Sequence, residues 1–306
     1  MEKAVVAEGL RKSFGTVVAI DRISFWVNSG EVFGFLGPNG AGKTTTVRIL
    51  TGILKQDSGR VLVMGVDVLR EPTRAKQSMG VVPEQANAYG DLSPWQNLML
   101  MGKIYGVSKR LRERRAEQLL SVLELLDRRD DKVREFSRGM KQKLLFAIAV
   151  LHAPPLLFLD EPTSGLDVQS ARLIRQMIDQ ENRRGTTVFL TTHNMDEASR
   201  LCHRIGIIRR GDLVAIDTPE QLRKAIEERQ LVEVKFNREP GDTGNLRKLQ
   251  GVGRLEVAGG IVRLFTETPD SVIRELVAYA QKNGLEFVSL NTSPPTLEDV
   301  FVELTK

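Results

Sequence analysis

The sequence predicts an α/β fold built on a largely parallel sheet, followed by a smaller α+β unit. Apolar runs alternate with amphipathic helical stretches over about residues 155–220, which is the pattern of strand–helix–strand units. Residues 223–306 contain elements in the order β-α-β-β-α-β, the order of ferredoxin-like units. Hydrophobic residues make up 41% and charged residues 27% of the 306 residues, which is ordinary globular usage and enough chain for two domains.

The first part of the chain reads as short strands that lead into a buried strand and a helix. Glycines and an Asn-Ser-Gly turn separate the first strands. Further along, Leu119, Leu123 and Leu126 recur at helical spacing. The predicted strands are 4–7, 17–20, 23–27 and 32–36, and the predicted helical segments are 45–54 and a helix-rich region over 92–151.

The second half is expected to alternate strands and helices before the α+β unit begins. We place the domain boundary after residue 222, so that residues 1–222 form the first domain and residues 223–306 the second. The expected elements are strands 156–159 and 187–191 around a helix at 170–183, a hairpin at 205–216, helix 219–228, strands 231–236, 255–257, 261–266 and 285–290, and helices near Asn245, over 271–282 and over 296–304.

The cysteine content suits a cytoplasmic protein, and the charge is compatible with an anionic partner although it favours a solvated basic exterior. The formal net charge is +5 and the sequence pI is about 9.3, a mild excess that fits a nucleotide, a nucleic acid or an anionic membrane, or simply a solvated basic exterior. Cys202 is the only cysteine, so no intrachain disulfide can form and the thiol is expected to be packed. The most apolar stretch, 144–159, is shorter than the about 20 residues that a membrane-spanning helix needs.

Residues 37–44 match the phosphate-binding pattern G-x-x-x-x-G-K-[ST], and a predicted strand and helix flank them as this pattern requires. Glycines allow backbone N–H groups to converge on a phosphate, and the helix N-terminus adds partial positive charge. Lys43 can reach the β- and γ-phosphates, and the Thr44 hydroxyl can ligate Mg²⁺. The expected nucleotide-binding residues of this segment are Gly37, Pro38, Asn39, Gly40, Ala41, Gly42, Lys43, Thr44 and Thr45.

A source of carboxylate for the metal follows a second buried strand. Residues 156–159 are four apolar residues, and Asp160 and Glu161 come directly after them. Asp160 is predicted to hold Mg²⁺ through water. Glu161 is predicted to polarise the attacking water as a general base, an effect typically worth about 10²- to 10⁴-fold in rate.

Between these two motifs lies a segment with the spacing S-x-G-x-x-Q, residues 137–142. The chain thus has a phosphate loop, then this segment, then an apolar strand that ends in Asp-Glu. This order of motifs resembles that of the ATP-binding cassette (ABC) family, and the resemblance covers about residues 4–220. Four other segments are similar to the family's remaining motifs: Ser164-Gly165-Leu166-Asp167 to its D-loop, His193 to its switch histidine, Pro83-Glu84-Gln85 to its Q-loop and Phe14 to its adenine-stacking aromatic. The resemblance implies a P-loop NTPase fold with a mostly parallel core sheet, an antiparallel β subdomain and a helical subdomain at about 86–151.

The resemblance also implies an ATPase that works as a dimer, with ATP as its substrate and Mg²⁺ as its cofactor. In this family two cassettes pack head to tail, so that Ser137 and the Gly139 backbone of one subunit close over the γ-phosphate held by Lys43 of the other. Asp167 is then expected at the dimer contact. Phe14 is expected to stack on adenine and His193 to contact the γ-phosphate.

Two segments depart from the family's pattern. The usual signature is L-S-G-G-Q, and here Ser137 and Gly139 are kept while Phe136, Arg138 and Met140 replace the Leu, the first Gly and the Gln. At the Q-loop, a gapless alignment puts Glu84 where the family has glutamine and leaves Gln85 one place on. Either residue is therefore a candidate for contact with Mg²⁺ and the attacking water.

The C-terminal part narrows the subclass, because residues 293–301 resemble the tail of ATPase subunits of daunorubicin-resistance-type exporters. The leading hypothesis is an ATP-hydrolysing subunit, paired with a second copy at the cytoplasmic face of the membrane, that drives a separate integral membrane permease. The C-terminal unit holds no catalytic cluster and is expected to be regulatory or dimer-stabilising. A helix over 93–105, with Trp95, Leu98, Met99 and Met101, is expected to lie near the permease.

The alternative function is an ABC ATPase that acts on DNA or on ribosomes. The chain between Lys43 and Ser137 is too short for the long coiled coil of chromosome-type cassettes, and translation-factor types carry two cassettes in one chain. We therefore expect no nucleic-acid partner. An importer subunit fits less well, because many sugar-importer cassettes carry a tail rich in β-barrel structure and this tail is α+β.

Overall fold

The computed structural model describes residues 2–85, 88–224, 230–240 and 243–293. The chain forms two compact units, Met1–Thr218 and Pro219–Lys306. The boundary between the units lies after residue 218, whereas the sequence predicted it after residue 222. The boundary is earlier because helix α8 (Pro219–Lys224) groups with the second unit. Each unit has its own apolar core and is described separately below.

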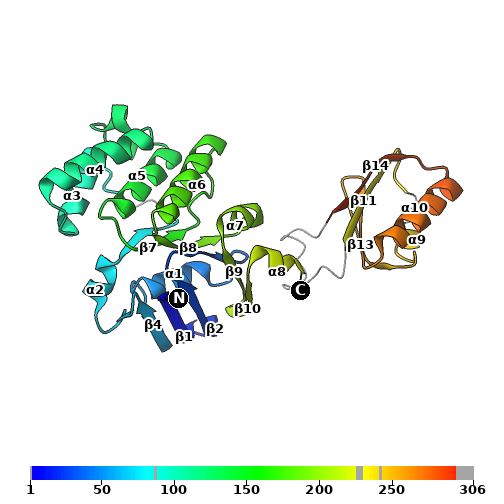
Figure 1. The fold of residues 1–306 in the computed structure, drawn as a ribbon, viewed down its shortest axis with the longest axis horizontal. Coiled ribbons are helices and arrows are strands. Elements are labelled where there is room, and N and C mark those ends of the chain that lie inside the picture. The colour runs from blue at the N-terminus through cyan, green and yellow to red at the C-terminus, as the bar shows by residue number, and fades with distance from the viewer. Residues whose placement is uncertain (1, 86–87, 225–229, 241–242, 294–306) are drawn as a thin grey trace. The chain divides into compact units, whose positions relative to one another are not determined.

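A six-stranded, mostly parallel sheet forms the centre of the first unit (Figure 1). Its strands lie in the order β10-β9-β3-β8-β7-β6, and within it only β10 is antiparallel to its neighbour. This confirms the predicted sheet. The loop after β3 opens between β8 and β9, the place in a parallel sheet where ligands usually bind. The bounds are β3 Val32–Leu36, β6 Met79–Val82, β7 Leu156–Asp160, β8 Thr187–Thr192, β9 Arg204–Arg209 and β10 Asp212–Asp217.

An antiparallel sheet with the order β2-β1-β4-β5 lies against the core sheet. The two short strands predicted at 17–20 and 23–27 are one strand, β2, which pairs with β1 through several register shifts. Arg22 adopts a left-handed conformation between them, with φ 51°, so the sequence pattern is interrupted while the strand continues. The bounds are β1 Lys3–Phe14, β2 Val17–Asn28, β4 Ser58–Val63 and β5 Val66–Asp67.

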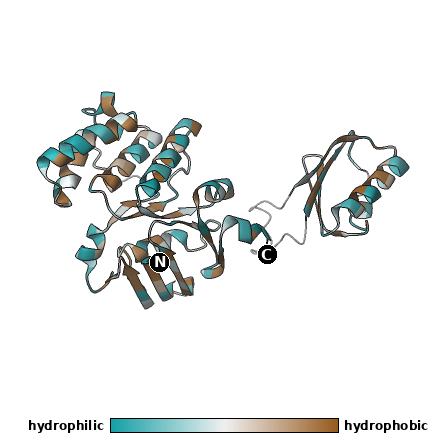
Figure 2. Cartoon of the chain, in the orientation of Figure 1, coloured by the Kyte–Doolittle hydropathy of each residue, from teal (hydrophilic) through white to brown (hydrophobic). Residues whose placement is uncertain are grey.

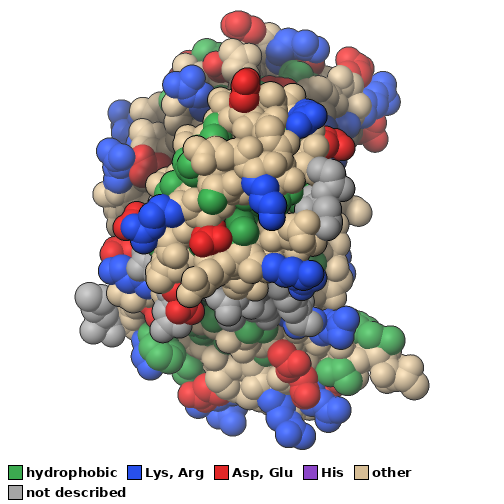
Figure 3. All heavy atoms as spheres, turned by 90° about the vertical axis from the view of Figure 1, so that its right-hand side faces the viewer, with side chains coloured by type: hydrophobic (Ala, Val, Ile, Leu, Met, Phe, Trp, Pro, Cys, Tyr) green, Lys and Arg blue, Asp and Glu red, His purple; other side chains and the backbone are tan. Residues whose placement is uncertain are grey.

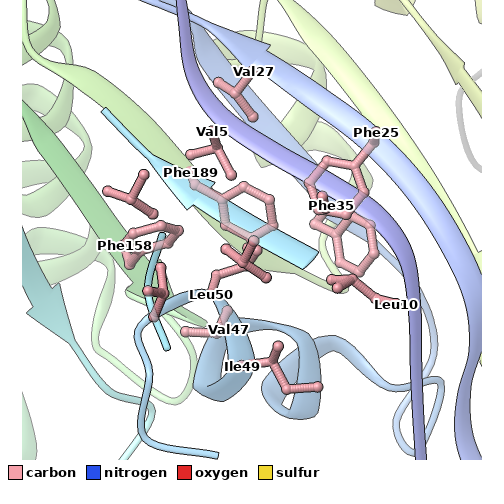
Figure 4. Packing of buried hydrophobic residues seen from close by; sticks show 14 of the residues in the cluster. Val5, Leu10, Phe25, Val27, Phe35, Val47, Ile49, Leu50, Phe158 and Phe189 are labelled. Carbon is pink, nitrogen blue, oxygen red and sulfur yellow. The ribbon is translucent and has the colours of Figure 1, made fainter. Parts of the chain in front are cut away.

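Phenylalanines from both sheets form the core of the first unit (Figure 4). Phe25 of β2 lies 5.5 Å from Phe35 of β3, and Phe189 of β8 lies 5.6 Å from Phe35, measured between ring centroids. Helix α1 (Lys43–Leu50) buries Val47 and Leu50 in the same cluster. This anchoring holds the N-terminus of α1 at the end of β3.

Helices make up most of the remaining part of the first unit, and Figure 2 shows both hydrophilic and hydrophobic residues along them. The predicted helix-rich region is confirmed as α3, α4 and α5. The N-terminus of α3 carries a capping box, in which Ser93 and Gln96 satisfy each other's backbone N–H groups. Within the described part of the chain, no helix is long and apolar enough to cross a membrane. The bounds are α2 Pro72–Gln77, α3 Pro94–Ile104, α4 Lys109–Val122, α5 Arg138–Val150, α6 Val168–Arg183 and α7 Met195–Leu201.

The structure confirms the prediction for Cys202 and adds three strands that the sequence did not predict. Cys202 is buried against Gly34 of β3, as expected, and burial raises the pKa of its thiol. Strands β4, β5 and β6 were not predicted. They are short, and β4 begins with the exposed residues Ser58, Gly59 and Arg60, so neither strand length nor alternation marks them.

The second unit is a four-stranded antiparallel sheet in the order β12-β13-β11-β14 with helices α9 and α10. Its element order confirms the predicted β-α-β-β-α-β pattern. Val234, Leu264 and Leu276 are among the residues of its core. The predicted helix 296–304 lies outside the described residues. The bounds are β11 Gln230–Phe236, α9 Thr243–Leu246, β12 Val252–Ala258, β13 Ile261–Thr266, α10 Pro269–Asn283 and β14 Phe287–Ser293.

The last predicted strand begins later than expected, because α10 ends in a left-handed cap. Gly284 has a φ of 60°, which glycine readily adopts. The Leu285 N–H still donates to Ala280 O at 2.9 Å.

On the face shown in Figure 3, basic and acidic side chains are interspersed and form no single large patch of one sign. This distribution fits the mild net charge of +5.

Candidate nucleotide-binding site

The loop between β3 and α1 has a backbone that only glycine allows at several positions. Gly40 and Gly42 have φ 80° and 110°. A Cβ at Gly42 would lie 2.6 Å from the carbonyl oxygen of Ala19, and a Cβ at Gly37 would lie 2.6 Å from that of Ile208. The loop therefore wraps closely against β2 and β9, and its glycines leave a backbone cradle of the kind that binds phosphate.

Lys43 folds back over this loop. Its ammonium donates to the carbonyl oxygens of Gly37 at 2.7 Å and of Pro38 at 3.2 Å, and only 6% of the side chain is exposed. The Lys43 Nζ also lies 3.2 Å from Glu161 Oε1, close enough for an ion pair. That oxygen is buried and accepts no hydrogen bond from the described residues. The Lys43 ammonium is thus held beside the loop, next to a Glu161 carboxylate oxygen that is free to accept a further hydrogen bond.

Asp160 ends β7 and faces two hydroxyl groups. Thr191 Oγ1 donates to Asp160 Oδ1 at 2.6 Å, and Thr44 Oγ1 lies 3.4 Å from the same oxygen. Burial raises the pKa of Asp160, an effect that the hydrogen bonds from Thr191 and Thr44 oppose. The structure therefore brings Thr44 and Asp160, both predicted as metal ligands, to one place.

Glu161 turns away from the strand in a left-handed conformation, with φ 50°. Its N–H donates to Thr191 Oγ1 at 3.0 Å, which holds this uncommon backbone geometry in place. Glu161 Oε2 lies 2.7 Å from His193 Nδ1, and the His193 ring is half-exposed. The general base and the histidine expected from the sequence are therefore in direct contact.

A cavity of about 310 Å³ opens over the loop and receives both Lys43 and Glu161. Glu84 lines this cavity, whereas Gln85 does not. Phe14 does not line it either. Phe14 lies at the end of β1 with 51% of its side chain exposed, and Lys12 Nζ lies 5.5 Å from its ring centroid. The cavity is lined by Ala19, Pro38, Asn39, Gly40, Gly42, Lys43, Thr44, Thr45, Glu84 and Glu161.

The residues present fit a nucleotide with a divalent cation. The glycine cradle offers backbone N–H groups, Lys43 offers a cation for phosphate oxygens, and Thr44 and Asp160 offer the hard oxygen donors that Mg²⁺ prefers. Glu161 Oε1 pairs with the Lys43 ammonium but accepts no hydrogen bond from the described residues, so it is a buried acceptor for a water bound beside the γ-phosphate.

Ser137, Gly139 and Asp167 form a second group that does not line the cavity. The Ser137 hydroxyl caps α5 by accepting from the Met140 N–H at 3.2 Å, and Asp167 caps α6 by accepting from the Ser170 N–H at 2.8 Å. That hydrogen bond lowers the pKa of Asp167. The Ser137 and Asp167 caps place the starts of α5 and α6 together, apart from the nucleotide cavity of the same chain.

The start of α5 lies against the start of α6 with little space between them. A Cβ at Gly139 would lie 2.7 Å from Ser170 Oγ and 3.3 Å from Asp167 Oδ2. The Arg138 guanidinium packs against the loop that leads into α6. A Cβ at Gly165 of that loop would lie 2.5 Å from Arg138 Nη1. Arg138 stands where the usual signature has its first glycine, and this contact shows where its side chain goes.

Sequence reasoning missed the threonines that orient these groups. Thr191 contacts both Asp160 and the Glu161 backbone, and Ala19 lines the cavity. The signal for Thr191 was present, because two consecutive threonines stand directly before His193 at the end of a buried strand. Ala19 comes from β2, after Phe14, and none of the quoted motifs includes it.

Comparison with known families accounts for both units of the chain. A family model described as ABC transporter matches residues 20–164. A second, described as the C-terminal domain of DrrA1-3-like ATP-binding proteins, matches residues 218–305. The linearmycin resistance ATP-binding protein LnrL of Bacillus subtilis is 35% identical over 302 residues, which cover 98% of this chain and 97% of that protein. The Nod factor export ATP-binding protein I of Rhizobium sp. (strain N33) is 38% identical over 305 residues, which cover 99% and 97%.

Solved structures share the fold of the first unit. A structure described as the ATP-binding subunit of an ABC transporter matches with a TM-score of 0.69 and 28% identity, over 72% of this chain and 92% of that chain. A dimeric ATP-binding cassette in a post-hydrolysis state, bound to ADP and Pi, matches with a TM-score of 0.65 and 24% identity, over 70% and 98%. The predicted fold and family are confirmed, and this chain belongs to the ABC transporter family as one of its ATP-hydrolysing, ATP-binding subunits.

Proposed function

We propose that this ATPase energises export through a separate integral membrane permease, from the cytoplasmic face of the membrane. The observation that carries the proposal is similarity over nearly the whole chain, second unit included, to ATP-binding proteins named for Nod factor export and linearmycin resistance. The name of the Nod factor relative supports export as the direction of transport. Because the two relatives are named for different compounds, we infer that the permease, and not the ATPase, selects the substrate.

In the proposed reaction, Lys43 leaves its carbonyl partners and binds the β- and γ-phosphates, supported by the N–H groups of the glycine loop. Glu161 accepts a proton from the attacking water, and His193 holds the Glu161 carboxylate through their 2.7 Å contact. Thr44 and Asp160 would hold Mg²⁺, which supplies charge neutralisation at the phosphates when bound. Glu84, which lines the cavity, is the better placed of the two Q-loop candidates.

The active unit is proposed to be a dimer of two copies of this chain. Ser137 and Gly139 do not line the cavity that contains Lys43, so one chain supplies only half of the groups expected around the γ-phosphate. A second copy placed head to tail would supply the Ser137 hydroxyl and the N-terminus of α5. The cassette structure described above is dimeric and has the same fold, which supports a dimer.

The surface proposed to contact the permease is an apolar strip on and beside α3. Leu100 and Ile104 lie one helical turn apart and are exposed, and Tyr89 is exposed in the preceding segment. Leu98, which the sequence suggested for this contact, is fully buried. Trp95 is partly covered by the Arg129 guanidinium, 4.5 Å from its ring centroid.

Charged substitutions in this strip test the proposed contact. Leu100→Asp with Ile104→Asp should reduce transport by about tenfold or more while ATP hydrolysis by the chain continues, because a buried unpaired charge at an interface is costly. Val122→Asp, at an exposed residue of α4 that is not part of the strip, is the control and should leave transport unchanged. Transport by the double variant at the wild-type rate would place the contact elsewhere.

The transport function itself is tested by finding the partner. The Glu161→Gln chain, purified from its native membranes in detergent with ATP and Mg²⁺, should retain bound nucleotide and bring down a polytopic membrane protein. Recovery of that protein supports the export proposal and identifies the permease. Recovery of nucleic acid or ribosomes without a membrane protein would favour the alternative ABC ATPase function and refute the transport proposal.

A further inference from the structure

Glu197 is a buried carboxylate that the proposed reaction does not use. It lies in the first turn of α7, with 3% of the residue exposed. Its two oxygens each accept one threonine hydroxyl: Thr163 Oγ1 donates to Oε1 at 2.6 Å, and Thr192 Oγ1 donates to Oε2 at 2.9 Å. The Glu197 N–H donates to Asn194 Oδ1 at 2.9 Å, which fixes the start of the helix.

The two threonines belong to the two turns that carry the reacting groups. Thr163 comes two residues after Glu161 in the turn that follows β7, and Thr192 directly precedes His193 at the end of β8. The Thr192 hydroxyl also accepts from the Asn194 N–H at 3.0 Å, so its position is fixed from both sides. Through Glu197 the turn after β7 is connected to the turn after β8.

This arrangement is not explained by stability alone. Within the described ranges, no Lys, Arg or His lies within ion-pair distance of the Glu197 carboxylate. A buried carboxylate without a cation costs more to bury than an apolar residue of the same size, and its hydrogen bonds offset only part of that cost. A buried carboxylate with two hydroxyl partners can, however, fix a geometry that an apolar residue could not fix.

We propose that Glu197 is a positioning residue for ATP hydrolysis, which holds the Glu161 turn and the His193 turn at the separation that their contact requires. Glu161 and His193 meet at 2.7 Å, and Glu161 has the uncommon φ of 50°. Displacement of a reacting group by about 1 Å can cost about 10²-fold in rate. The link through Thr163 also connects this pair to the segment that leads to Asp167.

The sharpest test changes the threonines and leaves Glu197 in place. Thr163→Val and Thr192→Val keep the side-chain shape and remove the hydroxyl, so kcat of the purified full-length chain should fall by about tenfold or more, with the dissociation constant for MgATP within about threefold of wild type. Thr163→Ser and Thr192→Ser keep the hydroxyl and should retain kcat within about threefold. This separation of kcat from nucleotide affinity, with recovery by serine, is not expected of a residue that only stabilises the fold.

The second readout is whether the losses in kcat caused by two substitutions multiply when both are made in one chain. Glu197→Ala should lower kcat by at least as much as either valine variant, and adding Thr163→Val to it should lower kcat by less than about twofold more, because both changes remove the same hydrogen bond. Asp196→Ala, an exposed acid in the same helical turn, is the matched control and should hydrolyse ATP at the wild-type rate.

Three results would overturn the proposal. The first is a wild-type kcat in both valine variants. The second is a loss of MgATP affinity by the same factor as kcat without recovery in the serine variants, which would mean that the bonds only support the fold. The third is full multiplication of the Glu197→Ala and Thr163→Val losses, which would mean that the two residues act separately.

Discussion

Asp160 and Glu161 are neighbours in the chain but lie in different chemical surroundings. Asp160 faces the hydroxyls of Thr191 and Thr44, whereas Glu161 faces the Lys43 ammonium and the His193 ring. The strand geometry at the end of β7 sends consecutive side chains in different directions, and the left-handed turn at Glu161 completes the separation. Two adjacent carboxylates can therefore have two roles.

The raised pKa of Asp160 leads to a prediction on stability. Because the folded protein holds a proton on Asp160 more tightly than the unfolded chain does, the ionised carboxylate destabilises the nucleotide-free protein above that pKa. Asp160→Asn keeps Oδ1 as an acceptor for both threonines and removes the charge. We expect the thermal midpoint of the nucleotide-free variant to exceed that of wild type by about 2–4 °C near neutral pH.

The pH dependence supplies the control for this prediction. The difference in midpoint should shrink as the pH falls toward the ordinary Asp value of 3.8, because the wild-type carboxyl then becomes neutral in both states. The same variant should lose about 10²-fold or more in Mg²⁺-dependent hydrolysis. A variant midpoint at or below the wild-type midpoint near neutral pH would contradict the assignment of Asp160 as a buried, desolvated carboxyl.

At the scale of the elements, local patterns were predicted well and long-range ones were not. The strand over 32–36 and the loop after it were predicted because a short apolar run and a glycine motif are adjacent in the sequence. The hairpin over 205–216 was predicted for the same reason. By contrast, strand β6 is a short strand whose place at the sheet edge depends on pairing with β7, more than seventy residues later in the chain.

The candidate site also contains residues that the sequence predicted and residues that only the structure reveals. Each motif is a run of consecutive residues, so its members could be named from the sequence, including Lys43, Asp160 and Glu161. The groups that orient them come from pairing of parallel strands: β7 and β8 are aligned so that Asp160 lies opposite Thr191. Thr191 is marked in the sequence only by its place before His193 at the end of a buried strand, and no sequence spacing reveals the Thr163–Glu197–Thr192 link.

A histidine at the junction of the helical region and the core sheet gives a prediction at this scale. His152 follows α5, its Nε2 lies 3.2 Å from Met79 O of β6, and its ring stacks on Tyr105 with centroids 3.8 Å apart. Burial, with a smaller contribution from the charge of Arg115, lowers the pKa of His152 to about 4. The ring is therefore neutral when it packs between α3 and β6.

Acidification should weaken this junction. Between the ordinary His value of 6.5 and about 4, the unfolded chain takes up a proton at His152 and the folded chain does not, so stability is lost as the pH falls through this window. His152→Phe keeps the stacking and does not titrate. Urea unfolding at the two ends of the window should show a smaller loss for the variant, by about 1–2 kcal/mol after allowance for the partly exposed ring. Parallel losses would assign the acid sensitivity to other groups.

At the scale of the whole molecule, the two units divide the work. The first unit holds every residue of the nucleotide cavity, together with the helix start that a second copy is proposed to require. The second unit has a core of its own, and within its described part no residue lines the nucleotide cavity. We propose a regulatory or dimer-stabilising role for it, consistent with its match to a C-terminal domain of ATP-binding proteins.

We propose that ATP is hydrolysed with Glu161 as the base in a site shared by two copies of the chain. It is tested most directly by measuring ATP turnover and molecular mass of the full-length Glu161→Gln chain with MgATP. We expect kcat to fall by about 10²-fold or more, with nucleotide still bound and the mass doubled relative to the nucleotide-free chain. Hydrolysis at the wild-type rate, or retained nucleotide on a chain that remains a monomer, would contradict it.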